Sequence, residues 1–224
     1  MKIACLHTAE SNVAVFDAAA MALGIPTGVL HHEVRADLLA AAERAGGLHD
    51  EIAQATQQAM LALAPGADAV LLTCSTLGPA VDALAHTATP ILRTDAALAA
   101  AAATVAQAGG KIVALCAVET TLGPTARLFE QAAQATGATV EVQLVPGAWA
   151  LFKAGDIEGY LRILAEAADS AYAHGASAVA LAQASMSGAA ALVTAGARQL
   201  SSPGAGLAAA VKAAARQRGP GAGA

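Results

Sequence analysis

The sequence predicts an α/β fold built from two similar halves, each with a mostly parallel sheet. Short β-branched runs alternate with longer Ala- and Leu-rich stretches, which is the pattern of strand–helix–strand units. Hydrophobic residues make up 56% of the 224 residues and charged residues 13%, so the chain can bury a sizeable core. The third observation is an internal repeat. KIACLHTAESNV at position 2 returns as KIVALCAVETTL at position 111, and GADAVLLTCSTLG at position 66 returns as GASAVALAQASMSG at position 175, so both motifs recur at the same offset.

The repeat defines the expected domains. Each half is an open, flavodoxin-like parallel sheet, and we expect a pseudo-dyad to relate the halves, with the site in the crevice between them, beyond the carboxyl ends of the strands. The first half comprises residues 1–95 plus 205–218, because the last helix returns to it, and the second half comprises residues 96–204. The Gly- and Pro-rich residues 219–224 are expected to form a flexible tail.

Seven short aliphatic runs predict strands. In order, they are Lys2–Leu6, Thr27–His31, Ala69–Thr73, Pro90–Arg93, Lys111–Cys116, Thr139–Leu144 and Ala178–Ala182. Nine longer stretches predict helices. In order, they are Val13–Leu23, Ala36–Ala45, Asp50–Leu63, Leu77–His86, Asp95–Ala108, Leu122–Thr136, Ala148–Ala154, Ile157–His174 and Leu207–Arg216. The segment LSSPGAG, residues 200–206, predicts a turn.

Composition excludes several classes of function. The net charge is −5 and no basic cluster is present, so nucleic acid is not an expected partner. No window of about 18 apolar residues and no signal-peptide pattern occurs, which predicts a cytoplasmic protein without a membrane partner. The three cysteines predict neither a disulfide framework nor a zinc site. His31 and His32 are adjacent on a predicted strand and point to opposite faces, so no metal site is expected there.

Four hydroxyl-rich loops follow the repeated strands and carry the candidate chemistry. They are His7–Asn12, Cys74–Thr76, Glu119–Thr121 and Gln183–Ser185. Hydroxyl groups and free backbone N–H groups at the start of a helix bind anions such as carboxylate or phosphate. The alternative is that Ser11, Ser75, Thr120 and Ser185 only cap helices. The sequence contains no GxGxxG after the first strand and no P-loop, so neither a dinucleotide nor an NTP is expected as cofactor.

Cys74 is the leading candidate for a reactive residue. It follows a buried strand and precedes a predicted helix, where the dipole and free N–H groups favour the thiolate. Cys5 lies within a strand and is expected to be a small buried hydrophobic residue, whereas Cys116 ends its strand.

The order of these segments resembles the aspartate/glutamate racemase superfamily, which includes Asp, Glu and hydantoin racemases, maleate isomerases and arylmalonate decarboxylase. The resemblance covers nearly the whole chain. Its segments are IACLHTAES, LLTCSTLGPA, ILRTDAALA, CAVETTLGPT, VEVQLVPGAWALFKAGD, VALAQASMSGA and LSSPGAG. It implies a cofactor-independent enzyme in which two cysteines flank the α-carbon of the substrate, one as base and one as acid.

The resemblance assigns only one of those cysteines. The first matches Cys74, and the second belongs one repeat length later, at Gln183, or at Ala184 if the register shifts by one position. Neither side chain can exchange a proton at neutral pH. His7, Glu119 and Cys116 are the candidates for replacing the missing acid, and the usual pKa of a histidine suits His7 to that role.

We therefore expect a cofactor-independent racemase or isomerase that moves a proton at the carbon α to a carboxylate, with Cys74 as acid/base and no metal. A small carboxylate is the expected partner, and a homodimer is the expected assembly. Alternatives are a single-cysteine decarboxylase of a malonate-type acid and a non-catalytic carboxylate-binding protein. Besides Cys74, the expected catalytic residues are Gln183 and His7. The expected substrate-binding residues are Thr8, Ser75, Thr76, Glu119, Thr120, Thr121, Ala184 and Ser185.

Overall fold

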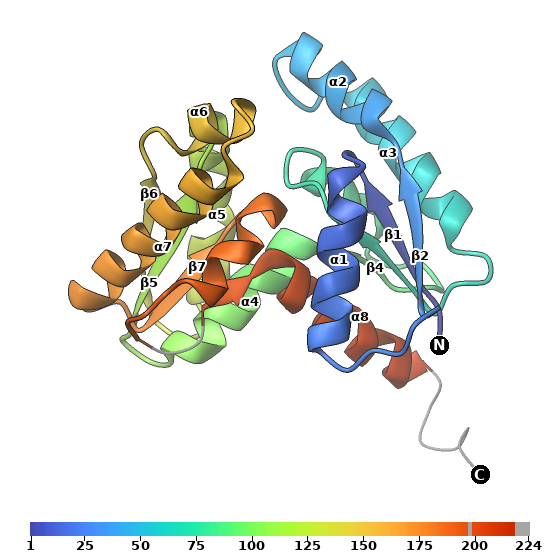
Figure 1. Ribbon diagram of the computed structural model, residues 1–224. Coiled ribbons are helices and arrows are strands. Elements are labelled where there is room, and N and C mark those ends of the chain that lie inside the picture. Colours follow the sequence, from blue (N-terminus) through green and yellow to red (C-terminus); the bar gives the residue numbers. More distant parts are fainter. Residues whose placement is uncertain (197–198, 218–224) are drawn as a thin grey trace. The chain divides into compact units, whose positions relative to one another are not determined.

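The computed structural model describes residues 1–196 and 199–217, which form two compact α/β units (Figure 1). The first unit contains Met1–Thr94 and the C-terminal segment that begins at Pro203, and the second contains Asp95–Ser202. Each unit has a four-stranded, all-parallel sheet flanked by helices, which confirms the predicted fold class. The predicted tail, residues 219–224, lies outside the described residues, as does residue 218.

The first sheet has the strand order β2-β1-β3-β4. Its strands are β1 (Ile3–His7), β2 (Leu30–Val34), β3 (Ala69–Leu72) and β4 (Ile91–Arg93). Its helices are α1 (Ser11–Ala22), α2 (Ala36–Ala45), α3 (Asp50–Leu63), the 3₁₀ helix η1 (Gly78–Leu84) and α8 (Ser202–Gln217). Every residue of the central strands β1 and β3 is buried, as expected for parallel strands covered on both faces.

The two faces of the first sheet pack against different helices, because successive side chains of a strand point to opposite sides. Ala4 and Leu6 of β1 join a hydrophobic cluster with Leu38 of α2 and Met60 of α3. His7 faces α1 instead, where its ring lies 5.1 Å from that of Phe16. This alternation directs Cys5 and His7, two residues apart on one strand, to the α1 side of the sheet.

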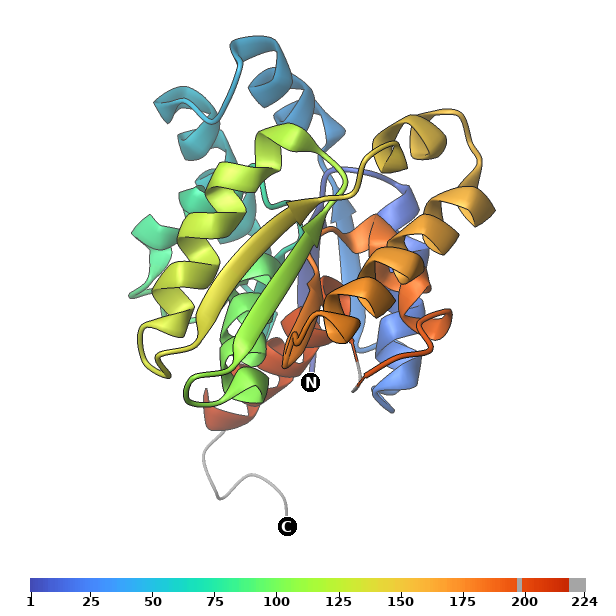
Figure 2. The same ribbon diagram turned by 90° about the vertical axis from the view of Figure 1, so that its left-hand side faces the viewer.

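The second sheet has the equivalent strand order β6-β5-β7-β8. Its strands are β5 (Lys111–Cys116), β6 (Thr139–Leu144), β7 (Ala178–Leu181) and β8 (Leu200–Ser201). Its helices are α4 (Thr94–Ala106), η2 (Glu119–Thr121), α5 (Leu122–Ala133), α6 (Ala148–Lys153), α7 (Ile157–Ala173) and the 3₁₀ helix η3 (Ala184–Ala191). Figure 2 shows α5 (yellow-green) and α7 (orange) on opposite sides of β5.

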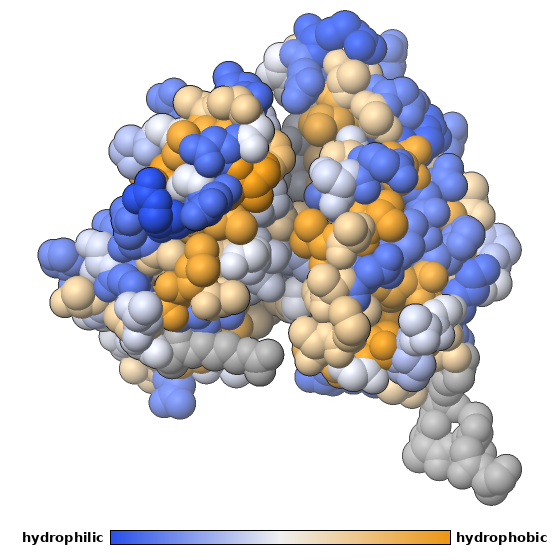
Figure 3. All heavy atoms as spheres, viewed as in Figure 1, coloured by the Kyte–Doolittle hydropathy of each residue, from blue (hydrophilic) through white to orange (hydrophobic). Residues whose placement is uncertain are grey.

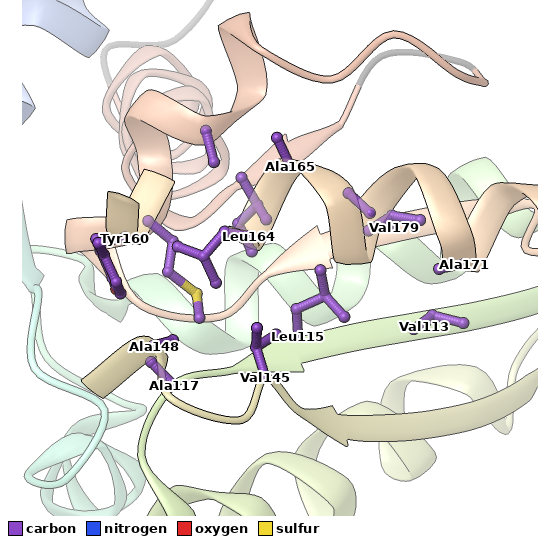
Figure 4. Packing of buried hydrophobic residues seen from close by; sticks show 14 residues of the cluster. Val113, Leu115, Ala117, Val145, Ala148, Tyr160, Leu164, Ala165, Ala171 and Val179 are labelled. Atoms are coloured by element: carbon purple, nitrogen blue, oxygen red, sulfur yellow. The ribbon is translucent and has the colours of Figure 1, made fainter. Parts of the chain in front are cut away.

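Small side chains let α7 pack closely on the second sheet. Ala165 and Ala171 of α7 are buried in the same cluster as Val113 of β5 and Val179 of β7 (Figure 4). Tyr160 adds a large, fully buried aromatic side chain to this cluster. An Ala-rich sequence with few aromatic residues therefore still buries a continuous core.

The strand registers reproduce the internal repeat. Ile3 of β1 pairs with Ala69 of β3, and Ile112 of β5 pairs with Ala178 of β7, so both members of the second pair lie one repeat length after those of the first. The outer pairs differ by one position, because Ile3 pairs with Leu30 whereas Ile112 pairs with Val140. The central strand pair is thus the most faithfully repeated part of the two units, and it is this pair that carries the predicted site loops.

Three predicted elements differ from the structure. The strand expected at Thr27–His31 is Leu30–Val34, because Val29 N–H bonds to Pro26 O and closes a turn first. The helix expected at Leu77–His86 is the shorter η1. The turn expected at 200–206 is strand β8 followed directly by α8, with Pro203 in its first turn, where proline is tolerated.

Hydrophobic residues reach the surface of both units (Figure 3). Met21 is 77% exposed, Leu192 49% and Ile157 47%. Among the described residues, no helix is both long and apolar enough to cross a membrane.

Candidate active site

Cys74 and Gln183 occupy equivalent positions, two residues beyond the carboxyl ends of β3 and β7. Both residues are half-buried. Their side chains differ, because Cys74 carries a thiol and Gln183 a carboxamide.

The Cys74 thiol is the accessible one of the three cysteines. Cys5 and Cys116 are fully buried, whereas Cys74 is partly exposed and packs against the hydrophobic cluster on the α2 and α3 side. Among the described residues, none forms a hydrogen bond to it. The predicted placement at the start of an α-helix is wrong, because η1 begins at Gly78 and is a short 3₁₀ helix. Activation of the thiol by a helix dipole therefore does not apply here.

The neighbouring hydroxyl groups of Ser75 and Thr76 are half-buried and form no hydrogen bond to another described side chain or carbonyl. The loop is held instead by its backbone, through Gly78 N–H and Ser75 O at 3.1 Å. The alternative role as helix caps is wrong for the four candidate residues. The residues preceding α1, η1, α5 and η3 are Glu10, Leu77, Thr121 and Gln183, and none caps its helix through its side chain.

Arg93 is a candidate site residue that the sequence analysis missed. It ends β4, pairs in register with Leu72 of β3, and exposes only 11% of its side chain. Its guanidinium lies over Gly78, where an added Cβ would collide with it. Nη1 lies 3.4 Å from Asp82 Oδ1. A half-buried positive charge therefore lies beside the loop that carries Cys74. The sequence signal that could have predicted this is an arginine at the end of the strand that follows the cysteine loop.

His7 is buried and held by other side chains. Its Nδ1 lies 2.9 Å from Thr73 Oγ1, and its Nε2 lies 2.8 Å from His32 Nδ1. Burial, together with the charge of a protonated His32, lowers the pKa of His7 to about 4. His7 is therefore neutral at pH 7, with both nitrogens engaged, which leaves it no proton to give a substrate.

The structure also brings together donors that the sequence analysis did not combine. Ligand atoms of Cys5, His7 and His32 all lie within 4.8 Å of one another. His31 is exposed while His32 is half-buried, so the expected alternation of these adjacent histidines is confirmed. The cluster escaped notice because Cys5 and His32 are far apart in sequence and meet only through the β1–β2 register.

The carboxamide of Gln183 is engaged within its own unit. Its Oε1 accepts from Ala117 N–H at 2.9 Å, and its Nε2 donates to Thr121 Oγ1 at 2.9 Å. Thr121 also donates to Val118 O. These contacts link the ends of β5 and β7 and use both polar groups of the side chain.

The other predicted residues fall into two groups. Ser185 is hydrogen-bonded to Tyr160 Oη at 2.8 Å, and burial raises the pKa of that tyrosine. Burial likewise raises the pKa of the Cys116 thiol, which makes a poor acid/base at neutral pH. The second group forms no hydrogen bond to another described side chain. In this group Glu119 and Thr120 are exposed, Ala184 is half-buried and Thr8 is buried.

Comparisons with known proteins give the fold a context. The sequence matches no model of a protein family, and no curated protein matches it. An aspartate racemase from Picrophilus torridus has a similar structure, with a TM-score of 0.68 at 13% identity, covering 96% of this chain and 95% of that chain. A glutamate racemase isoform from Bacillus anthracis gives 0.65 at 14% identity, covering 97% and 82%.

A third structure extends the same likeness. An aspartate racemase homologue from Pyrococcus horikoshii has a TM-score of 0.58 at 15% identity, covering 96% of this chain and 99% of that chain. At these identities the likeness establishes the racemase-like two-unit α/β fold. The reaction has to be inferred from the residues of the site.

Proposed function

We propose that this chain is a cofactor-independent enzyme of the isomerase type, which transfers a proton at the carbon α to a carboxylate with Cys74 as acid/base. The observation that carries the proposal is the partly exposed thiol at the end of a central strand, two residues beyond β3. The racemase-like fold supports a reaction of this class. We further propose that a small carboxylic acid is the substrate.

Binding of the carboxylate is assigned to the groups around the thiol. Ser75 and Thr76 follow Cys74 directly and have hydroxyl groups that no other described side chain engages. Arg93 adds a positive charge beside the same loop. Neutralising the carboxylate makes the adjacent C–H more acidic, and donors aimed at the developing enolate lower the barrier further. A thiolate produced by losing a proton to solvent would then remove the α-proton, and a proton from solvent on the opposite face of the planar enolate would complete the inversion.

A second candidate function follows from Gln183. The position equivalent to Cys74 holds a carboxamide whose two polar groups are already hydrogen-bonded, so it offers no second acid. A single thiol suffices for decarboxylation of a malonate-type acid, because only one protonation of the enolate is required. A third possibility is a carboxylate-binding protein that has kept the binding groups and lost the chemistry.

Proton exchange in D₂O separates these functions. Purified protein is incubated with α-amino, α-hydroxy and malonate-type acids, and the α-proton signal and released CO₂ are followed. Exchange or inversion that disappears in Cys74→Ala and persists in Cys116→Ala supports the isomerase. Release of CO₂ with a single deuteron incorporated supports the decarboxylase. Calorimetric binding without exchange or CO₂ release in any substrate would contradict both enzymes and leave the binding protein.

The expected homodimer is a separate proposal. Exposed hydrophobic side chains on both units, such as Met21 and Ile157, are consistent with a contact between copies. Sedimentation equilibrium is expected to give about twice the chain mass of 21.9 kDa at micromolar protein. A mass equal to that of one chain would contradict the dimer.

A further inference from the structure

The cluster of Cys5, His7 and His32 has a geometry that strand pairing dictates. Cys5 and His7 are two residues apart on β1 and therefore share the α1 face of the sheet. Cys5 pairs in register with His32 of β2, which places the second imidazole beside them. The sulfur and nitrogen donors lie within 4.8 Å of one another. Cys5 and His7 are fully buried, so the donors are held by backbone and packing rather than by loops.

One arrangement of the hydrogen bonds around the two imidazoles leaves two lone pairs facing each other. Thr73 Oγ1 donates to Leu6 O at 3.1 Å and so accepts from His7 Nδ1–H at 2.9 Å. His32 Nε2–H donates to Asp17 Oδ1 at 3.2 Å. A neutral imidazole carries one N–H, so His7 Nε2 and His32 Nδ1 then meet at 2.8 Å without a proton between them. Two acceptors at that separation repel each other unless a cation joins them.

We propose that this cluster binds one divalent transition-metal ion of the zinc class through Cys5 Sγ, His7 Nε2 and His32 Nδ1. Thiolate and imidazole are the ligands that such ions prefer, and three protein ligands leave one position of a tetrahedron for water. An ion bound by both nitrogens removes the repulsion between their facing lone pairs. The site lies within the first unit and is independent of the function proposed above.

Outer contacts of the cluster match those of metal sites in proteins. A histidine that binds a metal through one nitrogen usually donates its other N–H to a carboxylate or another oxygen, which sets its tautomer. Asp17 does this for His32 and Thr73 does it for His7. Asp17 is 61% exposed and His32 16% exposed, which gives an ion a route from solvent.

Protonation of the ligands defines the proton balance of binding. A neutral imidazole binds an ion through its free nitrogen without losing a proton, whereas the Cys5 thiol must give up its proton. One ion binds, one S–H bond breaks, one metal–sulfur bond forms, and the proton leaves to solvent. The resulting site has one net positive charge, next to the Asp17 carboxylate.

Two arrangements without a metal compete with this proposal. A proton between the imidazoles would make one of them a cation. Rotation of the Thr73 hydroxyl toward His7 would instead give a neutral chain from Thr73 to Asp17, at the loss of its bond to Leu6 O. In both arrangements the cluster binds no metal and Cys5 is only a buried hydrophobic residue.

Cobalt and zinc titrations of the chelator-treated, reduced protein separate these possibilities. We expect one Co²⁺ per chain, a thiolate-to-cobalt charge-transfer band, and displacement of that band by Zn²⁺. Cys5→Ser is expected to remove the band and His32→Gln to weaken binding. The matched controls are His31→Gln, the exposed neighbour on the same strand, and Cys74→Ser, the accessible thiol, and both should retain the band.

A further variant covers the case in which the buried substitutions do not fold. Asp17→Asn changes an exposed outer residue and is expected to weaken cobalt binding about 10- to 100-fold. Absence of a charge-transfer band in the wild-type protein would overturn the proposal. The same conclusion follows if the band survives in folded Cys5→Ser, disappears in Cys74→Ser, or is unchanged in affinity in Asp17→Asn.

Discussion

At the scale of single residues, the three thiols differ in access and in proton affinity. Cys5 and Cys116 are fully buried, and burial raises the pKa of both, to about 12 for Cys5. Of the three cysteines, only Cys74 is partly exposed. A thiolate is required for alkylation, so the buried thiols stay protonated and unreactive near neutral pH.

We therefore predict that iodoacetamide labels Cys74 and neither of the other cysteines in the native protein. Peptide mapping by mass spectrometry, with the unfolded protein as the reference for full labelling, measures the three rates. A malonate-type ligand should slow the labelling of Cys74 if the carboxylate binds beside it. Equal and slow labelling of all three thiols would mean that Cys74 is not accessible in solution.

Gln183 and Arg93 show where single-residue prediction reached its limit. The repeat located Gln183 at the position equivalent to Cys74, and the strand end was enough to find it. Its hydrogen bonds to Ala117 and Thr121 depend on side-chain rotamers, which no spacing in the sequence encodes. Arg93 was missed because its closeness to Gly78 arises from the β3–β4 register, and the cysteine–histidine cluster was missed for the same kind of reason.

At the scale of elements, η1 begins with a glycine that makes room for the Arg93 guanidinium. A Cβ at Gly78 would strike the guanidinium, which is the far end of a flexible side chain and can move away. We predict that Gly78→Ala changes the free energy of unfolding by less than about 1 kcal/mol yet weakens binding of a carboxylate. Calorimetry with malonate as the probe measures the loss.

The matched control is Gly123→Ala in α5, where an added methyl group meets only ordinary contact with Arg127. Arg93→Gln should reproduce the loss of binding caused by Gly78→Ala. If Gly78→Ala binds malonate as tightly as wild-type while Arg93→Gln does not, the glycine has no part in placing the arginine. Unchanged binding in both variants would remove Arg93 from the proposed site.

Asp169 on α7 connects that helix to the segment after η3. Its carboxylate accepts from Ala195 N–H at 2.7 Å, from Thr194 N–H at 2.9 Å and from the Thr194 hydroxyl at 2.8 Å. These hydrogen bonds, the one from Ala195 first, lower the pKa of Asp169. A carboxyl whose pKa is lower in the folded state stabilises the fold above its unfolded pKa, and that stabilisation is lost as the pH falls through the folded value.

We predict that Asp169→Asn unfolds at a lower denaturant concentration than wild-type at neutral pH. The difference between the two midpoints should shrink as the pH falls below the ordinary aspartate pKa of 3.8. Urea titrations of both proteins across this range give the difference directly and cancel the titration of all other groups. A difference that is constant with pH would show that the carboxylate charge is not what connects the segment to α7.

Prediction of the elements succeeded where hydrophobic pattern alone decides the structure. Residues 112–116 of one central strand and Ala69–Leu72 of the other are continuous, buried apolar runs, as expected for a sheet covered on both faces. Strand β2 has the sequence LHHEV, an edge strand with exposed His31 and Glu33, and its polar residues concealed it. The short 3₁₀ helices η1 and η3 differ from α-helices in hydrogen-bond spacing, which side-chain pattern does not report.

At the scale of the whole molecule, the two units share one strand order but have different polar residues at the equivalent position after the third strand of each unit. Gln183 reaches across to Ala117 N–H and Thr121 in the second unit. The internal repeat maps these partners onto Thr8 and Asn12 in the first unit, where Cys74 stands in place of glutamine. Cysteine is too short to make the same bridge, so the first unit gives up two hydrogen bonds and gains an accessible thiol.

This equivalence predicts that the substitutions Cys74→Gln and Gln183→Cys have opposite effects on stability. Cys74→Gln should restore the bridge to Thr8 N–H and Asn12, so we expect it to be at least as stable as Cys74→Ala while all α-proton exchange is lost. Gln183→Cys should lose two hydrogen bonds and about 1–3 kcal/mol of unfolding free energy. Ala184→Cys is its control, since it keeps the glutamine. Urea unfolding and exchange in D₂O measure the two properties separately.

Should Gln183→Cys prove as stable as Ala184→Cys, the bridge contributes nothing to the second unit. Should Cys74→Gln retain exchange, the thiol is not the acid/base and the proposed chemistry belongs to another group.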